Sequence, residues 1–342
     1  MRLSFKQSYE KNQPFINSKS FQKIRHTILI PTTIIAMFGM LMLYSAGEGL
    51  FPWCIKQLIY FSIFTVFAIF LAHINTIVLR KSAYIFYALS IGLLLFVILF
   101  GHVSMGARRW IDLKIIKLQP SEIAKVAIIL AFARIFENIK PVRKIFDKRL
   151  LIIAGLTMLP FSLIVLQPDL ATGLILTLLS ITICFACGIN SKIFLGGIVT
   201  IICASPLLFL FLHGYQKNRI LNFLNPDRDP LGSGYNINQS KIAVGSGGLF
   251  GKGITQGSQS HLGFLPENQT DFIFTMFAEE TGLFGCIIAI ICYIYIMQYG
   301  IRVSLEAKSI FCKVIALGGS SLIFLHWFVN LCMITGMLPA AG

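Results

Sequence analysis

The sequence is poor in charged residues, and poorest in acidic ones. Only 13% of its 342 residues are charged, and 14 of these are acidic while 29 are basic. An ordinary soluble domain has about 25% charged residues. Hydrophobic residues make up 56% of the chain, which is more apolar surface than so few charges can cover in water. The composition excludes a soluble globular domain, a disordered chain, a collagen-like fibre and a disulfide scaffold, and it predicts an all-α polytopic membrane protein.

The sequence also lacks recognisable spacing for metal ligands, disulfides or nucleotide phosphates. The 8 cysteines fall mostly inside apolar runs, and the 6 histidines are scattered. The glycine-rich run 247–253 differs from a phosphate-binding loop, because Ser246 stands where that pattern needs its first glycine and Gly253 where it needs Ser or Thr. We therefore expect no organic cofactor. We attribute the net charge of +15 to basic residues that are distributed unequally across a bilayer. We expect no nucleic-acid partner.

Nine apolar runs reach the length of about 20 residues that a spanning helix needs. They lie at 28–46, 53–72, 82–101, 121–137, 150–167, 169–187, 193–212, 272–298 and 314–338. The first run follows a basic segment, but it is too long for the apolar region of a typical signal peptide and more spans follow it. It is expected to remain in the mature protein.

Basic residues sort to one side of the nine spans. The tail 1–27 and the connection 138–149 are both rich in Lys and Arg, so the positive-inside rule places the N-terminus in the cytoplasm. Two segments on the outer side are also basic, namely 102–120 and the long loop 213–271. An anionic ligand at the outer membrane face explains them. The alternative is that long external loops tolerate any charge.

Asp271 stands where the external loop 213–271 meets the next span. A partly desolvated carboxylate there suits a general base. The alternative is structural, because Thr270 or Asp271 can cap the helix that begins here. Glu279 and Glu280 follow about two turns later, and ionisable groups inside a membrane usually face a cavity or a partner.

The shorter outer segment offers further polar candidates. Glu122 and Lys125 are spaced i,i+3 on one helix face, which predicts a mutual ion pair. Trp110 follows two arginines and is either an interfacial belt residue or a platform for a sugar or lipid headgroup. Asp169 lies in the turn between two spans, where a helix cap is expected.

Four stretches in order resemble the SEDS family (shape, elongation, division and sporulation), and its RodA branch more than the division-type FtsW. They are 106–113, 119–125, 167–173 and above all 219–285, and the similarity runs from about residue 28 to the end. The resemblance implies one transmembrane glycosyltransferase domain over 28–342, after a basic cytoplasmic tail over 1–27. It also implies a multi-pass protein of the bacterial cytoplasmic membrane, with its active site on the outer face.

In that family the expected activity is polymerisation of lipid II into β-1,4 glycan strands for cell-wall elongation and rod shape. The resemblance implies a class B penicillin-binding protein as the cross-linking partner, among other membrane proteins of the elongation complex. It makes Asp271 the essential aspartate and the catalytic base, and Trp110 functionally important. An inverting displacement needs positive groups against the departing pyrophosphate, and a divalent cation such as Mg or Mn is a further candidate. The candidate positive groups are Arg108, Arg109, Lys114, Lys117 and Lys252, whereas Glu122, Lys125, Asp169, Glu279 and Glu280 are expected to be structural or regulatory.

The sequence departs from the family in one respect. Family members continue past the stretch that ends at Gly342 with an external segment containing a Ser-Tyr-Gly-Gly motif and a tenth helix, so activity of this chain is expected to depend on whether that helix is dispensable. Two other functions compete with polymerisation: a lipid II flippase and a non-catalytic scaffold of the elongation complex. A flippase needs polar groups along a path to the cytoplasmic half and often has inverted repeats, and neither is evident here.

Overall fold

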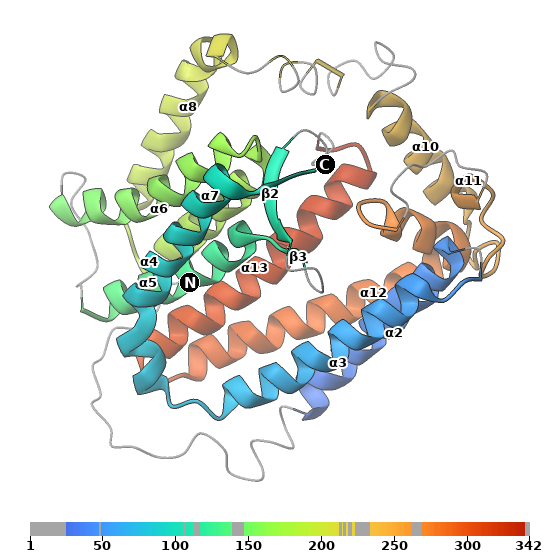
Figure 1. Ribbon diagram of the computed structural model, residues 1–342, viewed down its shortest axis with the longest axis horizontal. Helices are drawn as coiled ribbons and strands as arrows, with labels where there is room; N and C mark the ends of the chain where they lie inside the picture. Colours follow the sequence, from blue (N-terminus) through green and yellow to red (C-terminus); the bar gives the residue numbers. More distant parts are fainter. Residues whose placement is uncertain are drawn as a thin grey trace. The chain divides into compact units, whose positions relative to one another are not determined.

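The computed structural model describes residues 25–47, 49–104, 107–112, 117–138, 147–211, 214, 217, 221–222, 233–261 and 269–338. The chain forms two compact units. As far as their residues are described, the first contains Ile74–Cys203 and Met297–Leu325, and the second contains Ile16–His73, Ala204–Ile296 and His326–Gly342. Figure 1 follows the elements along the chain.

Each of the nine apolar runs forms a helix. In order they are α2 (Ile30–Ala46), α3 (Pro52–Ala72), α4 (Thr76–Phe100), α5 (Pro120–Asn138), α6 (Lys148–Leu166), α7 (Leu170–Ala186), α8 (Ser191–Phe211), α12 (Ile273–Glu306) and α13 (Ile310–Ile334). The mostly helical polytopic fold is thus confirmed.

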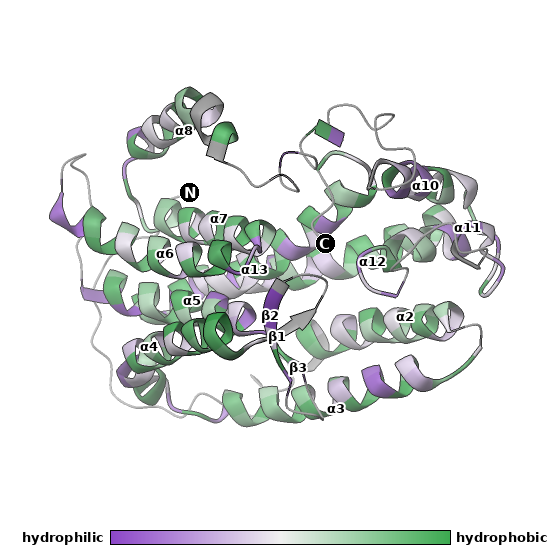
Figure 2. Cartoon of the chain, turned by 45° about the horizontal axis from the view of Figure 1, so that its top comes forward, coloured by the Kyte–Doolittle hydropathy of each residue, from purple (hydrophilic) through white to green (hydrophobic). Residues whose placement is uncertain are grey.

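Among the described residues, six helices are long and apolar enough to cross a membrane. They include α3, α4, α6, α12 and α13, and the sixth runs from Thr27 to Ala46. The helices α7 and α8 are apolar but shorter over their described parts, and α5 is not among the six. The chain is a multi-pass membrane protein, whereas a total of nine crossings stays a prediction. The colouring in Figure 2 shows the hydrophobic character of α2, α6 and α7, against the polar α10.

Several short elements were not predicted from the hydropathy pattern. A π-helical turn, η1 (Arg25–Leu29), precedes α2. The strands β1 (His102–Ser104), β2 (Ala107–Asp112) and β3 (Lys117–Leu118) form an antiparallel sheet in the order β1-β2-β3. The predicted external loop 213–271 contains α10 (Ser233–Ser246) and the short α11 (Ser258–His261).

Helix α5 is central to the packing of the first unit. Twelve of its side chains are buried, among them Lys125, whose exposed fraction is 0%. Ala127 and Ala131 of α5 pack against Tyr87 of α4, and the Tyr87 hydroxyl donates to the carbonyl of Leu156 in α6 at 2.9 Å. Small residues on α5 therefore let the neighbouring helices approach closely, as is common for helix pairs in membranes.

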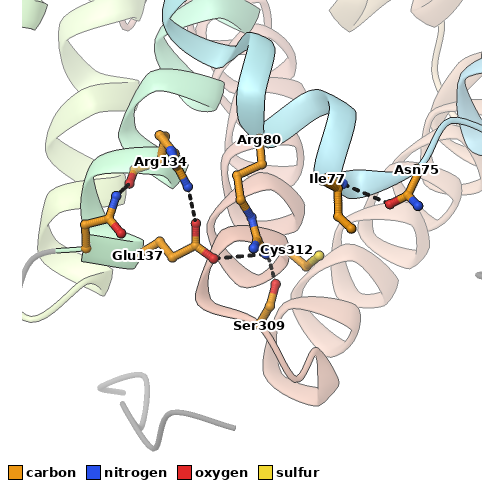
Figure 3. Close-up of polar contacts among 8 residues, drawn as sticks. Asn75, Ile77, Arg80, Arg134, Glu137, Ser309 and Cys312 are labelled. Atoms are coloured by element: carbon orange, nitrogen blue, oxygen red, sulfur yellow. Dashed lines mark hydrogen bonds and ion pairs between the residues drawn. The ribbon is translucent and has the colours of Figure 1, made fainter. Parts of the chain in front are cut away.

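One carboxylate ties α4 to α5 within the same unit. Glu137 accepts from Arg80 at 3.0 Å and from Arg134 at 3.1 Å (Figure 3). The Arg80 guanidinium lies over the ring of Phe311 at the start of α13. Nearby, Ser309 caps α13, because its hydroxyl accepts the Cys312 amide at 3.1 Å.

Helix α10 packs onto α12 and α13 in the second unit. Ala243 of α10, Phe272, and Met333 and Ile334 of α13 form one buried apolar cluster. A second cluster joins Met42 of α2 to Met276, Phe277 and Ala289 of α12. These two clusters hold the beginning of α12 between its neighbours.

Candidate functional site

Asp271 lies two residues before α12 and is half-buried. Its backbone carbonyl accepts a hydrogen bond from Nδ2 of Asn330 in α13 at 3.0 Å. The next residue, Phe272, is only 5% exposed because it inserts into the cluster with Ala243 and Met333. The backbone that carries the Asp271 carboxylate is therefore fixed by α13 on one side and by a buried aromatic anchor on the other.

A buried hydroxyl network continues this anchoring one turn further along α12. The hydroxyls of Ser240 in α10 and Thr275 in α12 lie 2.7 Å apart, and the Ser240 hydroxyl donates to the carbonyl of Ile334 at 3.0 Å. Ser240 and Thr275 are both 0% exposed. Three helices thus meet at the first turn of α12, which sequence reasoning missed because these small hydroxyl residues carry no distinctive signal.

Helix α12 is interrupted at Gly282, where φ is 67° and ψ is −165°. The loop 247–253 fills the break with main-chain hydrogen bonds. The amides of Lys252 and Gly253 donate to the carbonyls of Glu279 and Glu280, both at 3.0 Å. On the other side, the amides of Leu283 and Phe284 donate to the carbonyls of Gly248 and Leu249 at 2.9 and 3.1 Å. The loop therefore satisfies backbone groups that the interruption would otherwise leave without partners.

Glycine is required where the loop and the broken helix touch. A Cβ atom on Gly251, whose φ is +79°, would lie 2.1 Å from the carbonyl oxygen of Glu280. A Cβ atom on Gly247 would lie 2.2 Å from the carbonyl oxygen of Ala278. The glycine-rich run 247–253 is thus a packing element against α12.

Lys252 forms an ion pair with Glu279. Its Nζ lies 2.8 Å from Oε1 of Glu279 and donates to the hydroxyl of Ser258 at 2.7 Å. The same Oε1 accepts the Gln259 amide at 3.0 Å and the Ser258 hydroxyl at 3.3 Å. The Glu279 side chain is 0% exposed, so its charge is balanced inside the protein by Lys252 and by the hydrogen bonds from Ser258 and Gln259. This contact was not predicted.

Glu280 is bound from a different helix. It is 1% exposed, and the hydroxyl of Ser45 in α2 donates to its Oε1 at 2.5 Å. The two adjacent glutamates thus bind in opposite directions, Glu279 to the glycine-rich loop and Glu280 to α2. Of the two surroundings expected for such carboxylates, a cavity or a partner, both glutamates have partners.

The first unit carries the other group of predicted residues, on and beside the small sheet. Arg109 on β2 donates from Nε to the carbonyl of Gln167 at 3.3 Å and from Nη2 to the carbonyl of Pro168 at 2.5 Å. It therefore ties the sheet to the turn between α6 and α7. Arg108 and Lys117 are exposed, Trp110 is half-buried, and Lys114 lies outside the described residues.

The predicted pair on α5 forms. Nζ of Lys125 donates to Oε1 of Glu122 at 2.8 Å, with Lys125 0% exposed and the Glu122 side chain 51% exposed. Asp169 is 5% exposed and caps α7, because its Oδ1 accepts the Thr172 amide at 3.2 Å. Its Oδ2 accepts from the Gln119 amide group at 3.4 Å. The predicted ion pair and the predicted helix cap are both confirmed.

The described residues include no group of three or more His, Cys, Asp or Glu side chains that could hold a metal ion. Glu279 and Glu280 are adjacent in sequence, but each carboxylate is bound by different neighbours. The described carboxylates therefore do not form a metal site, and the divalent cation stays a prediction.

The fold and these polar groups define a polytopic helical membrane protein with two polar centres, one around the sheet of the first unit and one at the start of α12 in the second. Comparison with known proteins makes this specific. The family model of cell cycle proteins that covers FtsW, RodA and SpoVE matches residues 25–342, so the chain belongs to that family.

Three known proteins illustrate the relationship. The chain is 37% identical over 331 residues to the peptidoglycan glycosyltransferase MrdB of Escherichia coli K12, covering 95% of this chain and 89% of MrdB. It matches a chain in a solved peptidoglycan synthase complex, described for coordinating polymerization and crosslinking, with 26% identity, a TM-score of 0.78 and coverage of 92% and 88%. It also shares the fold of the rod shape determining protein RodA of Thermus thermophilus, with 23% identity, a TM-score of 0.67 and coverage of 91% and 85%.

Proposed function

We propose that this chain is a RodA-like peptidoglycan glycosyltransferase that polymerises lipid II into β-1,4 glycan strands. The identity of 37% with the glycosyltransferase MrdB supports the activity. The observation that carries the site is the half-buried Asp271, whose backbone is fixed by Asn330 and Phe272 at the start of α12. A carboxylate on a rigid backbone is suited to general-base catalysis, because the base must reach the reacting proton in a defined geometry.

The chemistry is a single inverting displacement. The acceptor sugar's 4-hydroxyl oxygen forms a bond to C1 of the donor sugar while the bond from C1 to the undecaprenyl pyrophosphate breaks. The Asp271 carboxylate takes the proton of the attacking hydroxyl, and the pyrophosphate leaves with the bonding electron pair. The α-linkage of the donor is thereby converted to the β-linkage of the product.

The departing pyrophosphate needs positive charge near it. Among the predicted cations, Arg108 and Lys117 are exposed on the sheet and suit this role best, with Arg109, Lys114 and Lys252 as further contributors and Trp110 as a platform for sugar or lipid headgroup. Arg109 and Lys252 also have structural contacts, to the α6–α7 turn and to Glu279. A divalent cation that adds to this charge is part of the proposal, but none of the steps above depends on it.

The same proposal includes the location of the enzyme and its partner proteins. The enzyme resides in the bacterial cytoplasmic membrane with its N-terminus in the cytoplasm and its active site on the outer face. It works with a class B penicillin-binding protein that cross-links the new strand, and with other membrane proteins of the elongation complex. The structural relative from a complex that coordinates polymerization and crosslinking supports this partnership.

The decisive experiment is polymerisation of lipid II by the purified protein with its cognate class B penicillin-binding protein. Two proteins are compared, this chain and its Asp271→Asn variant. Glycan strands from the chain but not from the variant support the proposal. Equal strand formation by both overturns the role of Asp271 as the base.

The competing functions predict different outcomes. A lipid II flippase or a non-catalytic scaffold retains its activity in the Asp271→Asn variant. If the chain makes no strands where a related enzyme does, polymerisation is excluded and the scaffold is favoured.

A further inference from the structure

Asn330 is an amide side chain on the apolar helix α13. It lies in the last turns of α13, between Trp327 and Met333, and is half-buried. An amide in such surroundings is stable only if its hydrogen bonds are made within the protein. Its Nδ2 donates to the backbone carbonyl of Asp271 at 3.0 Å, so the bond joins α13 to the segment before α12.

We propose that Asn330 is a positioning residue for the Asp271 carboxylate, a role that rests on the proposed function of Asp271 as the base. Asp271 lies two residues before α12, where the regular hydrogen bonds of that helix begin. The Asn330 amide supplies an external hydrogen bond at that point, from a helix that is itself anchored nearby by Ile334 and Met333. The side chain of the base is thereby aimed by a residue that does not touch the substrate.

The hydrogen bond from Asn330 acts on the orientation of the Asp271 carboxylate and not on its charge. Asn330 is neutral and binds the main chain, so removing it leaves the Asp271 carboxylate in place but less well oriented. A displacement of about 1 Å at a reacting group costs about 100-fold in rate. We therefore expect a loss in kcat with KM close to its native value, because the cations that bind the pyrophosphate are not affected.

The test uses three substitutions at this position in the full chain with its penicillin-binding protein. Asn330→Ala removes the amide, and Asn330→Leu replaces it with an apolar group of similar size. Asn330→Gln keeps a donor on a longer side chain. The expected result is a fall in kcat of about 10- to 100-fold for the Ala and Leu variants, with partial recovery in the Gln variant. Thr335→Val is the matched control, because the hydrogen bonds described for the Thr335 hydroxyl go to the carbonyls of Leu331 and Cys332 in the adjoining α13.

The Asp271→Asn variant, assayed in parallel, separates the two proposals. If Asp271→Asn is inactive while Asn330→Ala and Asn330→Leu are folded with native kcat, the positioning role is overturned and the base assignment stands. If Asp271→Asn retains native turnover, the proposed base is wrong and the positioning role fails with it. If Asn330→Ala and Asn330→Leu both fail to give a monodisperse folded protein, Asn330 serves stability and the inference is also overturned.

Discussion

The ammonium group of Lys252 lies 2.8 Å from a carboxylate oxygen of Glu279, and the two side chains differ sharply in exposure, at 28% for Lys252 and 0% for Glu279. The pair joins the glycine-rich loop to the first part of α12. Because Glu279 cannot reach water, the two members of the pair are not equivalent: loss of the lysine leaves a buried charge, whereas loss of the glutamate leaves a lysine that can turn to solvent.

This asymmetry predicts unequal costs of substitution. Lys252→Met is expected to lower the free energy of unfolding by about 3 kcal/mol, since breaking a buried pair leaves its partner uncompensated. Glu279→Gln is expected to cost clearly less. Thermal unfolding of the detergent-purified variants measures both, with Lys192→Met, at an exposed position, as the control. Equal costs for the two substitutions would contradict the asymmetric pair.

The close contact between the loop 247–253 and the interrupted helix α12 predicts a second effect. Gly251→Ala is expected to destabilise the protein strongly, because the added Cβ meets the carbonyl oxygen of Glu280 and the backbone has φ of +79°. Gly245→Ala is the matched control, since a Cβ there meets nothing within 4 Å. The unfolding midpoints of the two variants are compared. A midpoint for Gly251→Ala as high as that of Gly245→Ala would contradict the close contact between the loop and α12.

The neighbouring arginines on β2 are expected to separate stability from activity. Arg109→Gln loses the charged hydrogen bonds to the α6–α7 turn, which are worth about 1.5–3 kcal/mol each. Arg108→Gln is expected to leave the unfolding midpoint unchanged and to reduce polymerisation, because Arg108 is exposed and proposed to face the pyrophosphate. Unfolding and lipid II polymerisation are measured on both variants, and an Arg108→Gln protein with native turnover would remove Arg108 from the site.

Two substitutions of Asp169 separate its role as the cap of α7 from the effect of its negative charge. Asp169→Ala removes the acceptor of the Thr172 amide and is expected to cost about 1 kcal/mol, whereas Asp169→Asn keeps a capping oxygen and is expected to cost less. A stability loss in Asp169→Asn as large as in Asp169→Ala would show that the negative charge near Lys125, rather than the cap, is what α7 requires.

The sequence predicted the helices because apolar length is a local property of the chain. Asp169 as a cap and Glu122 with Lys125 as a pair were likewise predictable, since each rests on neighbours within a few residues. The partners of Lys252, Arg109 and Asp271 were not predictable, because Glu279, Gln167 and Asn330 are brought to them only by folding.

The break at Gly282 was missed for a related reason. The sequence predicts one apolar run at 272–298, and a glycine inside such a run does not by itself predict an interruption. The requirement for glycine arises from the loop 247–253, whose backbone approaches too closely for a side chain. The small sheet at 102–118 was missed because its strands are too short for a period-2 pattern to stand out.

The interruption at Gly282 also explains why α12 is longer than the hydrocarbon core of a bilayer is thick. The 34 residues of α12 would measure about 51 Å as a straight helix, far more than the hydrocarbon core of about 30 Å. The stretch from Leu283 to Glu306 is by itself about 36 Å long and suffices to cross. The turns before Gly282 are thus surplus to the crossing, so they can carry two glutamates and follow directly on Asp271 without imposing buried charge on the lipid-spanning part.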